Sequence, residues 1–208
     1  MKALVIGGAL VLIVSVATGT VTADLSSTQE AALTTIDSVP TRAQLQNHEL
    51  VVPDDLITIA AQTSYEPGVR LRAIHGLAVY CTSVGVTCPV GSPAHTALVN
   101  VVIANTPAQA GADLLVLRAA IESLGPLRVP GDLADTDEGS GQVGPQLGAL
   151  LNHPSRDIRA AAARALADLR NCNAVNALRI RYQNESIDQV KLVISETLRI
   201  LSQPANCQ

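Results

Sequence analysis

Four segments of the 208-residue chain carry apolar residues at the same helical spacing, and this repetition restricts the fold more than any other feature. In each segment the residues stand at a start position and then four, five and eight positions later, which places them on one face of an α-helix. The four sets are Val69, Ala73, Ile74 and Leu77; Val116, Ala120, Ile121 and Leu124; Ile158, Ala162, Ala163 and Leu166; and Val190, Ile194, Ser195 and Leu198. The starts are 47, 42 and 32 residues apart, so the spacing predicts four helices of one repeating kind.

A second apolar stretch precedes each of these segments, at 56–61, 97–104, 147–151 and 175–182. Residues that break or start helices separate the two members of each pair, at 66–68, 106–107, 153–155 and 184–186. Among them are Pro and Ser, which helix starts favour. One helix–turn–helix unit cannot bury its apolar face alone, whereas units stacked side by side bury a continuous core. We therefore expect an all-α fold, a short α-solenoid of about four helix–turn–helix units.

Three of the repeated segments have a basic residue directly after their first aliphatic residue. The pairs are Val69-Arg70, Ile158-Arg159 and Val190-Lys191, whereas in the second segment the arginine is displaced to Arg118. An aliphatic–Arg pair followed by Ala-rich positions and Leu resembles the second helix of the HEAT-repeat family. The resemblance covers about residues 54–201 and implies HEAT-like units whose second helices line a concave face. A plain bundle of the same helices is the alternative.

The HEAT family also favours an aspartate in the turn within each unit, five residues before the aliphatic position, where it hydrogen-bonds along the stack. The corresponding positions in this chain hold Ser64, Gly111, His153 and Glu185. The comparison therefore implies that the polar ladder between units is mostly missing.

The first 23 residues have the layout of a secretory signal peptide. Lys2 is followed by a short apolar run, and a small-residue cleavage site ends at Ala23. The strongly apolar part is about 15 residues, shorter than the roughly 20 that span a bilayer, so we expect cleavage, with a membrane anchor as the alternative. After the signal peptide (1–23) we expect a spacer or capping segment at 24–52, the repeat domain at 53–203 with an insert loop at 125–145, and a tail at 204–208.

Four cysteines lie in the part of the chain that we expect to be exported: Cys81, Cys88, Cys172 and Cys207. An even number of cysteines in an oxidising compartment predicts two disulfides, and no histidine stands at zinc-ligand spacing beside them, so we expect no metal site. Cys81 and Cys88 would close a short loop after the first unit. Because neighbouring second helices run parallel in a repeat stack, Cys172 and Cys207 can meet beyond the helix ends. The leader and the cysteines together favour a secreted or periplasmic protein of bacterial origin.

Composition argues against several classes of function. Aromatic residues make up 1% of the chain, which leaves few rings on which sugars, tetrapyrroles or single-stranded nucleic acids could stack. The net charge of −4 also disfavours a nucleic-acid binder. Common nucleophile, metalloprotease and phosphate-binding motifs are absent from the sequence, and its four histidines are scattered. We therefore expect neither an enzyme nor a cofactor.

An acidic cluster lies in the expected insert loop, at Asp132, Asp135, Asp137 and Glu138. A calcium loop needs regularly spaced carboxylates and a glutamate at a fixed distance after its glycine. No glutamate follows Gly139 at that distance. We therefore expect residues 132–138 to form a solvated acidic loop rather than a calcium site.

Charge is unevenly distributed along the expected mature chain. Residues 24–151 include 5 basic and 13 acidic residues, whereas residues 152–208 include 8 basic and 5 acidic residues. We expect an acidic protein or peptide partner to bind at Arg156, Arg159, Arg164, Lys191 and Arg199. The alternative is a set of ordinary solvated side chains, with Arg164 and Asp168 forming a local pair one helical turn apart.

Two functions are compatible with these features. The first is an exported, non-catalytic protein-binding scaffold that needs no cofactor, binds no nucleic acid and does not contact the membrane after signal cleavage. The second is a structural or assembly subunit of an envelope or surface complex, tethered to the membrane by an uncleaved N-terminus. The fate of residues 1–23 distinguishes the two hypotheses.

Overall fold

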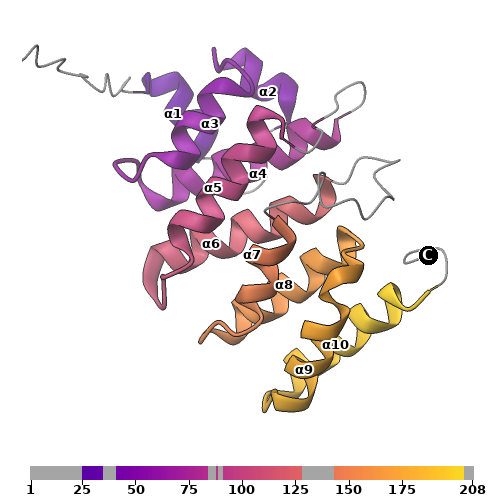
Figure 1. Cartoon of the computed structure of the whole chain (residues 1–208). Helices are drawn as coiled ribbons and strands as arrows, with labels where there is room; N and C mark the ends of the chain where they lie inside the picture. Colours follow the sequence, from indigo (N-terminus) through magenta and orange to yellow (C-terminus); the bar gives the residue numbers. More distant parts are fainter. Residues whose placement is uncertain (1–24, 35–40, 84–87, 89–90, 128–142, 204–208) are drawn as a thin grey trace, which may run out of the picture.

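The computed structural model describes residues 25–34, 41–83, 88, 91–127 and 143–203. Within these ranges the chain forms ten α-helices and two short 3₁₀ helices, and no strand (Figure 1). The expected all-α class is confirmed. The elements are α1 (Ser27–Thr34), α2 (Arg42–Asn47), α3 (Asp54–Ala61), α4 (Pro67–Thr82), α5 (Pro93–Asn105), α6 (Gly111–Leu124), η1 (Gly125–Leu127), α7 (Val143–Leu150), α8 (Arg156–Asp168), η2 (Cys172–Ala174), α9 (Val175–Asn184) and α10 (Asp188–Leu201).

Eight of the helices coincide with the segments that the apolar spacing predicts. The four repeated segments fall within α4, α6, α8 and α10, and the stretches that precede them fall on α3, α5, α7 and α9. The helix starts use the expected chemistry. Pro67 stands in the first turn of α4, where a missing N–H costs no hydrogen bond, and the Ser92 hydroxyl accepts the N–H of His95 at 3.4 Å at the start of α5.

The helices pack in pairs that follow one another in sequence order, from the indigo end to the yellow end of the molecule (Figure 1). We call α3–α4, α5–α6, α7–α8 and α9–α10 the first to fourth helix pairs; in each pair the two helices contact each other. Each second helix also contacts the second helix of the next pair, through α4–α6, α6–α8 and α8–α10. Adjacent second helices therefore share a continuous line of contacts.

The segment expected to be a spacer or cap contains the two short helices α1 and α2, and both contact α4. A capping box fixes the start of α2. The Thr41 hydroxyl accepts the N–H of Gln44, and the Gln44 side chain accepts the N–H of Thr41. α1 and α2 therefore pack against the first helix pair, at the N-terminal end of the described structure (Figure 1).

The core consists of small aliphatic side chains, as the composition requires. Ala73, Ala120 and Ala162 are completely buried, each at the second position of its repeated segment. α3 and α4 pack tightly at Gly76, because a Cβ at that position would lie 3.1 Å from Leu56 Cδ1 of α3. Small residues thus let α3 and α4 approach closely.

Several sequence-based expectations lie outside the described residues: the signal peptide at 1–23, Cys207, the acidic loop at 132–138 and the tail at 204–208. Of the expected insert loop at 125–145, the described ends are helical, because η1 covers its first residues and α7 begins at Val143. Across the described ranges, none of the helices combines the length and the apolar character needed to cross a membrane.

Candidate interaction surface and the junctions that support it

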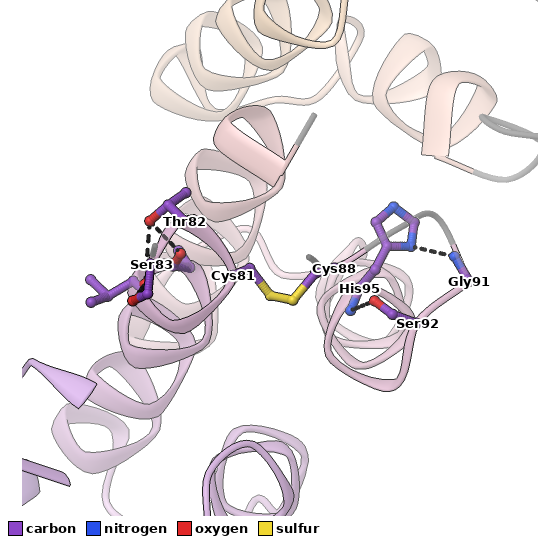
Figure 2. The surroundings of a disulfide bond; sticks show 9 residues. Cys81, Thr82, Ser83, Cys88, Gly91, Ser92 and His95 are labelled. Atoms are coloured by element: carbon purple, nitrogen blue, oxygen red, sulfur yellow. Dashed lines mark hydrogen bonds between the residues drawn. A yellow bond between two sulfur atoms is a disulfide. The ribbon is translucent and has the colours of Figure 1, made fainter. Parts of the chain in front are cut away.

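The first disulfide that the sequence predicts is present. Cys81, near the end of α4, is bonded to Cys88 in the segment before α5, with a Cα–Cα distance of 5.2 Å (Figure 2). Both side chains are buried. A disulfide of this kind is consistent with an oxidising compartment. Cys172 lies at the start of η2, but its expected partner Cys207 is outside the described residues, so that pairing stays a prediction.

A buried arginine joins the third and fourth helix pairs. Arg159 of α8 donates from Nε and Nη2 to the Glu185 carboxylate at 2.7 and 3.0 Å. Its Nη1 donates to the carbonyls of His153 and Pro154 at 2.9 and 2.8 Å. Glu185 lies between α9 and α10, so the guanidinium connects the start of one second helix to the start of the next.

Glu185 is 2% exposed and collects donors from three elements. Arg181 of α9 donates to its Oε2 at 3.1 and 2.8 Å, and the N–H groups of Ser186 and Ile187 donate to its Oε1, each at 3.0 Å. Burial alone would raise the pKa of this carboxyl. The hydrogen bonds from Arg159, Ile187 and Arg181 outweigh burial and lower the pKa from 4.5 to about 2. The Glu185 carboxylate is therefore charged, and both of its oxygens accept hydrogen bonds.

Polar contacts also cross the other junctions between helix pairs. Arg70 Nη1 of α4 lies 3.7 Å from Asp113 Oδ1 of α6, and His153 Nε2 lies 3.0 Å from the carbonyl oxygen of Ala108 in the α5–α6 turn. The junction of the third and fourth pairs has a further contact, because Thr197 of α10 donates its hydroxyl to the Ala163 carbonyl of α8 at 3.0 Å. Two of the four turn positions therefore supply polar contacts between pairs, which is more than the missing aspartates implied. The turn residues His153 and Glu185 bridge between pairs, although neither is the aspartate that the HEAT pattern favours.

The second helices carry a set of exposed side chains and the partly exposed His75; we call His75, Leu115, Arg118, Glu122, Asp157, Arg164, Leu192 and Glu196 the second-helix surface. Arg118 Nε donates to Glu122 at 2.8 Å within α6. Asp157 of α8 acts on Arg118 through charge, and Glu122 acts on His75 of α4 in the same way. Burial lowers the pKa of His75, and Glu122 opposes that shift. Charges of both signs therefore lie side by side on α6 and α8.

Two large apolar side chains interrupt these charges. Leu115 of α6 is 55% exposed and Leu192 of α10 is 72% exposed. Single exposed leucines are common on protein surfaces, but here both stand on second helices beside charged residues. Apolar side chains within a polar rim are the composition that protein-binding surfaces favour.

The five basic residues expected to bind a partner differ in their exposure to solvent. Arg159 is 7% exposed and is occupied by the internal bonds described above, so it is not available at the surface. Arg156, Arg164 and Arg199 are exposed, and Lys191 is partly exposed. Spacing along the helix did not reveal that the turn before α10 covers Arg159. The available signal was Glu185, an acidic residue in the next turn.

Acidic neighbours accompany most of the exposed candidates. Arg199 Nη2 lies 2.6 Å from Glu196 Oε1, and Arg156 Nε lies 3.6 Å from Asp157 Oδ1. Burial raises the pKa of Asp168, and the charge of Arg164 one turn before it opposes that shift. The surface is therefore of mixed charge rather than uniformly basic.

Comparisons with known proteins return no relative of this chain. No protein-family model matches the sequence, no curated protein is significantly similar to it, and no solved structure matches it. The likeness to HEAT repeats therefore rests on the residues and helix contacts of this chain alone.

Proposed function

We propose that this protein is an exported, HEAT-like α-solenoid that binds another protein through its second-helix surface and catalyses no reaction. The single observation that carries the proposal is the pair of exposed leucines, Leu115 of α6 and Leu192 of α10, set among charged side chains of both signs on α6, α8 and α10. Serial contacts through α4–α6, α6–α8 and α8–α10 support the solenoid. The leader at 1–23 and the Cys81–Cys88 bond support export.

The mixed charge of the surface changes the kind of partner that we expect. Arg118, Asp157 and Arg164 carry both signs on the neighbouring helices α6 and α8, so a partner with both acidic and basic side chains fits better than a purely acidic one. Affinity would come from apolar contact at the two leucines, and specificity from the charges around them.

Site-specific photo-crosslinking in the producing organism tests this proposal. A photoreactive residue would replace Leu115 or Leu192, and matched controls would replace Ile103 of α5 or Ile180 of α9, which are exposed to a similar degree on first helices. We expect one and the same protein to be captured from positions 115 and 192 and not from the control positions. Adducts at all four positions, or at none, would contradict a partner on this surface.

A further inference from the structure

Three of the four helix pairs carry a basic residue at the same position of the repeated segment. The position after the start of each repeated segment holds Arg70, Leu117, Arg159 and Lys191. Arg70 lies 3.7 Å from Asp113 of the next pair, and Arg159 lies 2.7 Å from Glu185 of the next pair. Lys191 holds the same position in the fourth pair, and no carboxylate among the described residues forms an ion pair with it. Its ammonium group is therefore free to meet a carboxylate from outside the chain.

The side of α10 that carries Lys191 differs from the equivalent side of α8. Ala163 of α8 is completely buried, and its carbonyl accepts the hydroxyl of Thr197 of α10. The equivalent residue of α10 is Ser195, which is exposed, and Leu192 and Arg199 nearby are exposed as well. Among the described residues, this part of α10 thus leaves basic and apolar side chains exposed, with Glu196 paired to Arg199 at 2.6 Å beside them.

The opposite end of the molecule is acidic. In Figure 1 helices α1 and α2 lie at one end and α9 and α10 at the other. Residues 24–66 contain 7 acidic residues and one basic residue. Glu30 and Glu49 are exposed there, and the side chain of Gln29 donates to the carbonyl of Glu49 at 3.2 Å, which places α1 beside that residue. Val51, next to them, is 60% exposed.

We infer that a second copy of this chain docks its acidic N-terminal end onto α10 of the first. Lys191 and Arg199 then face Glu30 and Glu49 of the second copy, and Leu192 lies against its Val51. The contact extends the pattern in which Arg70 and Arg159 each reach a carboxylate of the following helix pair. Because the two contacting surfaces are different, the association is head-to-tail and can continue beyond a dimer. The contact shares Leu192 with the second-helix surface, whereas Leu115 of α6 is not part of it.

A charge-swap experiment tests this inference with purified protein. One variant carries Lys191→Glu and Arg199→Glu, and a second carries Glu30→Lys and Glu49→Lys. A control, Arg118→Glu with Arg164→Glu, makes the same change in net charge as the first variant, but in the middle of the molecule. Sedimentation equilibrium would measure the average mass against protein concentration at about 0.01 M salt, where the Debye length is about 30 Å, and at about 1 M, where it is about 3 Å.

For the wild type and the control we expect an average mass that exceeds one chain at low salt, rises with concentration and falls at high salt. Each end variant alone should associate at least about tenfold more weakly, because like charges then face each other. An equimolar mixture of the two end variants should associate again, since the swapped ends are complementary.

A wild type that is monomeric throughout, or a mixture that stays monomeric, would overturn the inference. So would an end variant that associates as tightly as the wild type. Retention of the photo-crosslink from position 115 in the end variants would show that partner binding is unaffected, because Leu115 is not part of the proposed contact between copies.

Discussion

At the scale of single residues, Glu185 has more hydrogen-bond partners than any of the five basic residues that the sequence indicated as binding candidates. Its carboxylate binds one guanidinium from α8, one from α9 and two N–H groups at the start of α10. Removing one partner of a buried charge pair leaves the other charge without compensation, which costs more than the pair itself contributes. Arg159 is the partner that would be left, because it is buried with Glu185.

We expect Glu185→Gln to lower the free energy of unfolding by about 3–5 kcal/mol. The amide keeps the shape of the side chain but loses the charge that holds Arg159 and Arg181. Urea denaturation followed by circular dichroism would measure the change. Glu196→Gln is the matched control, because it breaks the exposed pair with Arg199, and it should cost about 1 kcal/mol or less. Equal effects of the two substitutions would contradict the role assigned to Glu185.

The same carboxylate gives an expected pH dependence. The pKa of Glu185 is about 2 in the folded protein and 4.5 ordinarily, so below 4.5 the unfolded chain takes up a proton that the folded chain does not. Its contribution is fully present above pH 4.5 and is lost as the pH falls from 4.5 towards 2, a difference of about 3 kcal/mol. The loss of stability between pH 5 and pH 2 should accordingly be smaller in Glu185→Gln than in the wild type. Parallel profiles would assign the acid sensitivity to other groups.

At the scale of helices, the sequence predicted the positions of the helices well, because buried apolar residues recur with the helical period. Val69, Ile158 and Val190 are all buried at the start of their segments, and the helices around them begin and end close to the expected breakers. What spacing did not predict is which polar side chains a neighbouring helix covers. Arg159 and Arg164 are both arginines of α8, yet only Arg159 is buried, because the turn before α10 lies over it.

Gly76 provides a test of the packing between α3 and α4. We expect Gly76→Leu to destabilise the protein by about 1–3 kcal/mol, because a Cβ there already lies 3.1 Å from Leu56 Cδ1 and a larger side chain has no space. Gly68→Ala is the control in the same helix. It has no atom within 4 Å of the added Cβ, so it should be neutral or stabilising by up to about 1 kcal/mol. Thermal unfolding of both variants would measure the difference. A Gly76→Leu protein as stable as the wild type would contradict the close approach of the two helices.

At the scale of the whole molecule, the contacts run mainly between neighbours. α4 contacts α6, α6 contacts α8 and α8 contacts α10, while the acidic and basic ends of the chain lie far apart (Figure 1). In such an arrangement each helix pair depends on its own folding and on the interface with the next pair. A perturbation at one end should therefore weaken with distance along the chain.

Hydrogen–deuterium exchange of the Glu185→Gln protein tests this serial arrangement most directly, with peptide-level mass spectrometry and the wild type as reference. We expect the largest loss of protection in α9 and α10, a smaller loss in α8, and no change in α1 to α4, because only the junction at Glu185 is weakened. An equal loss of protection in α1 to α4 and in α9 to α10 would instead show a single cooperative globule, and would contradict a solenoid of nearest-neighbour helix pairs.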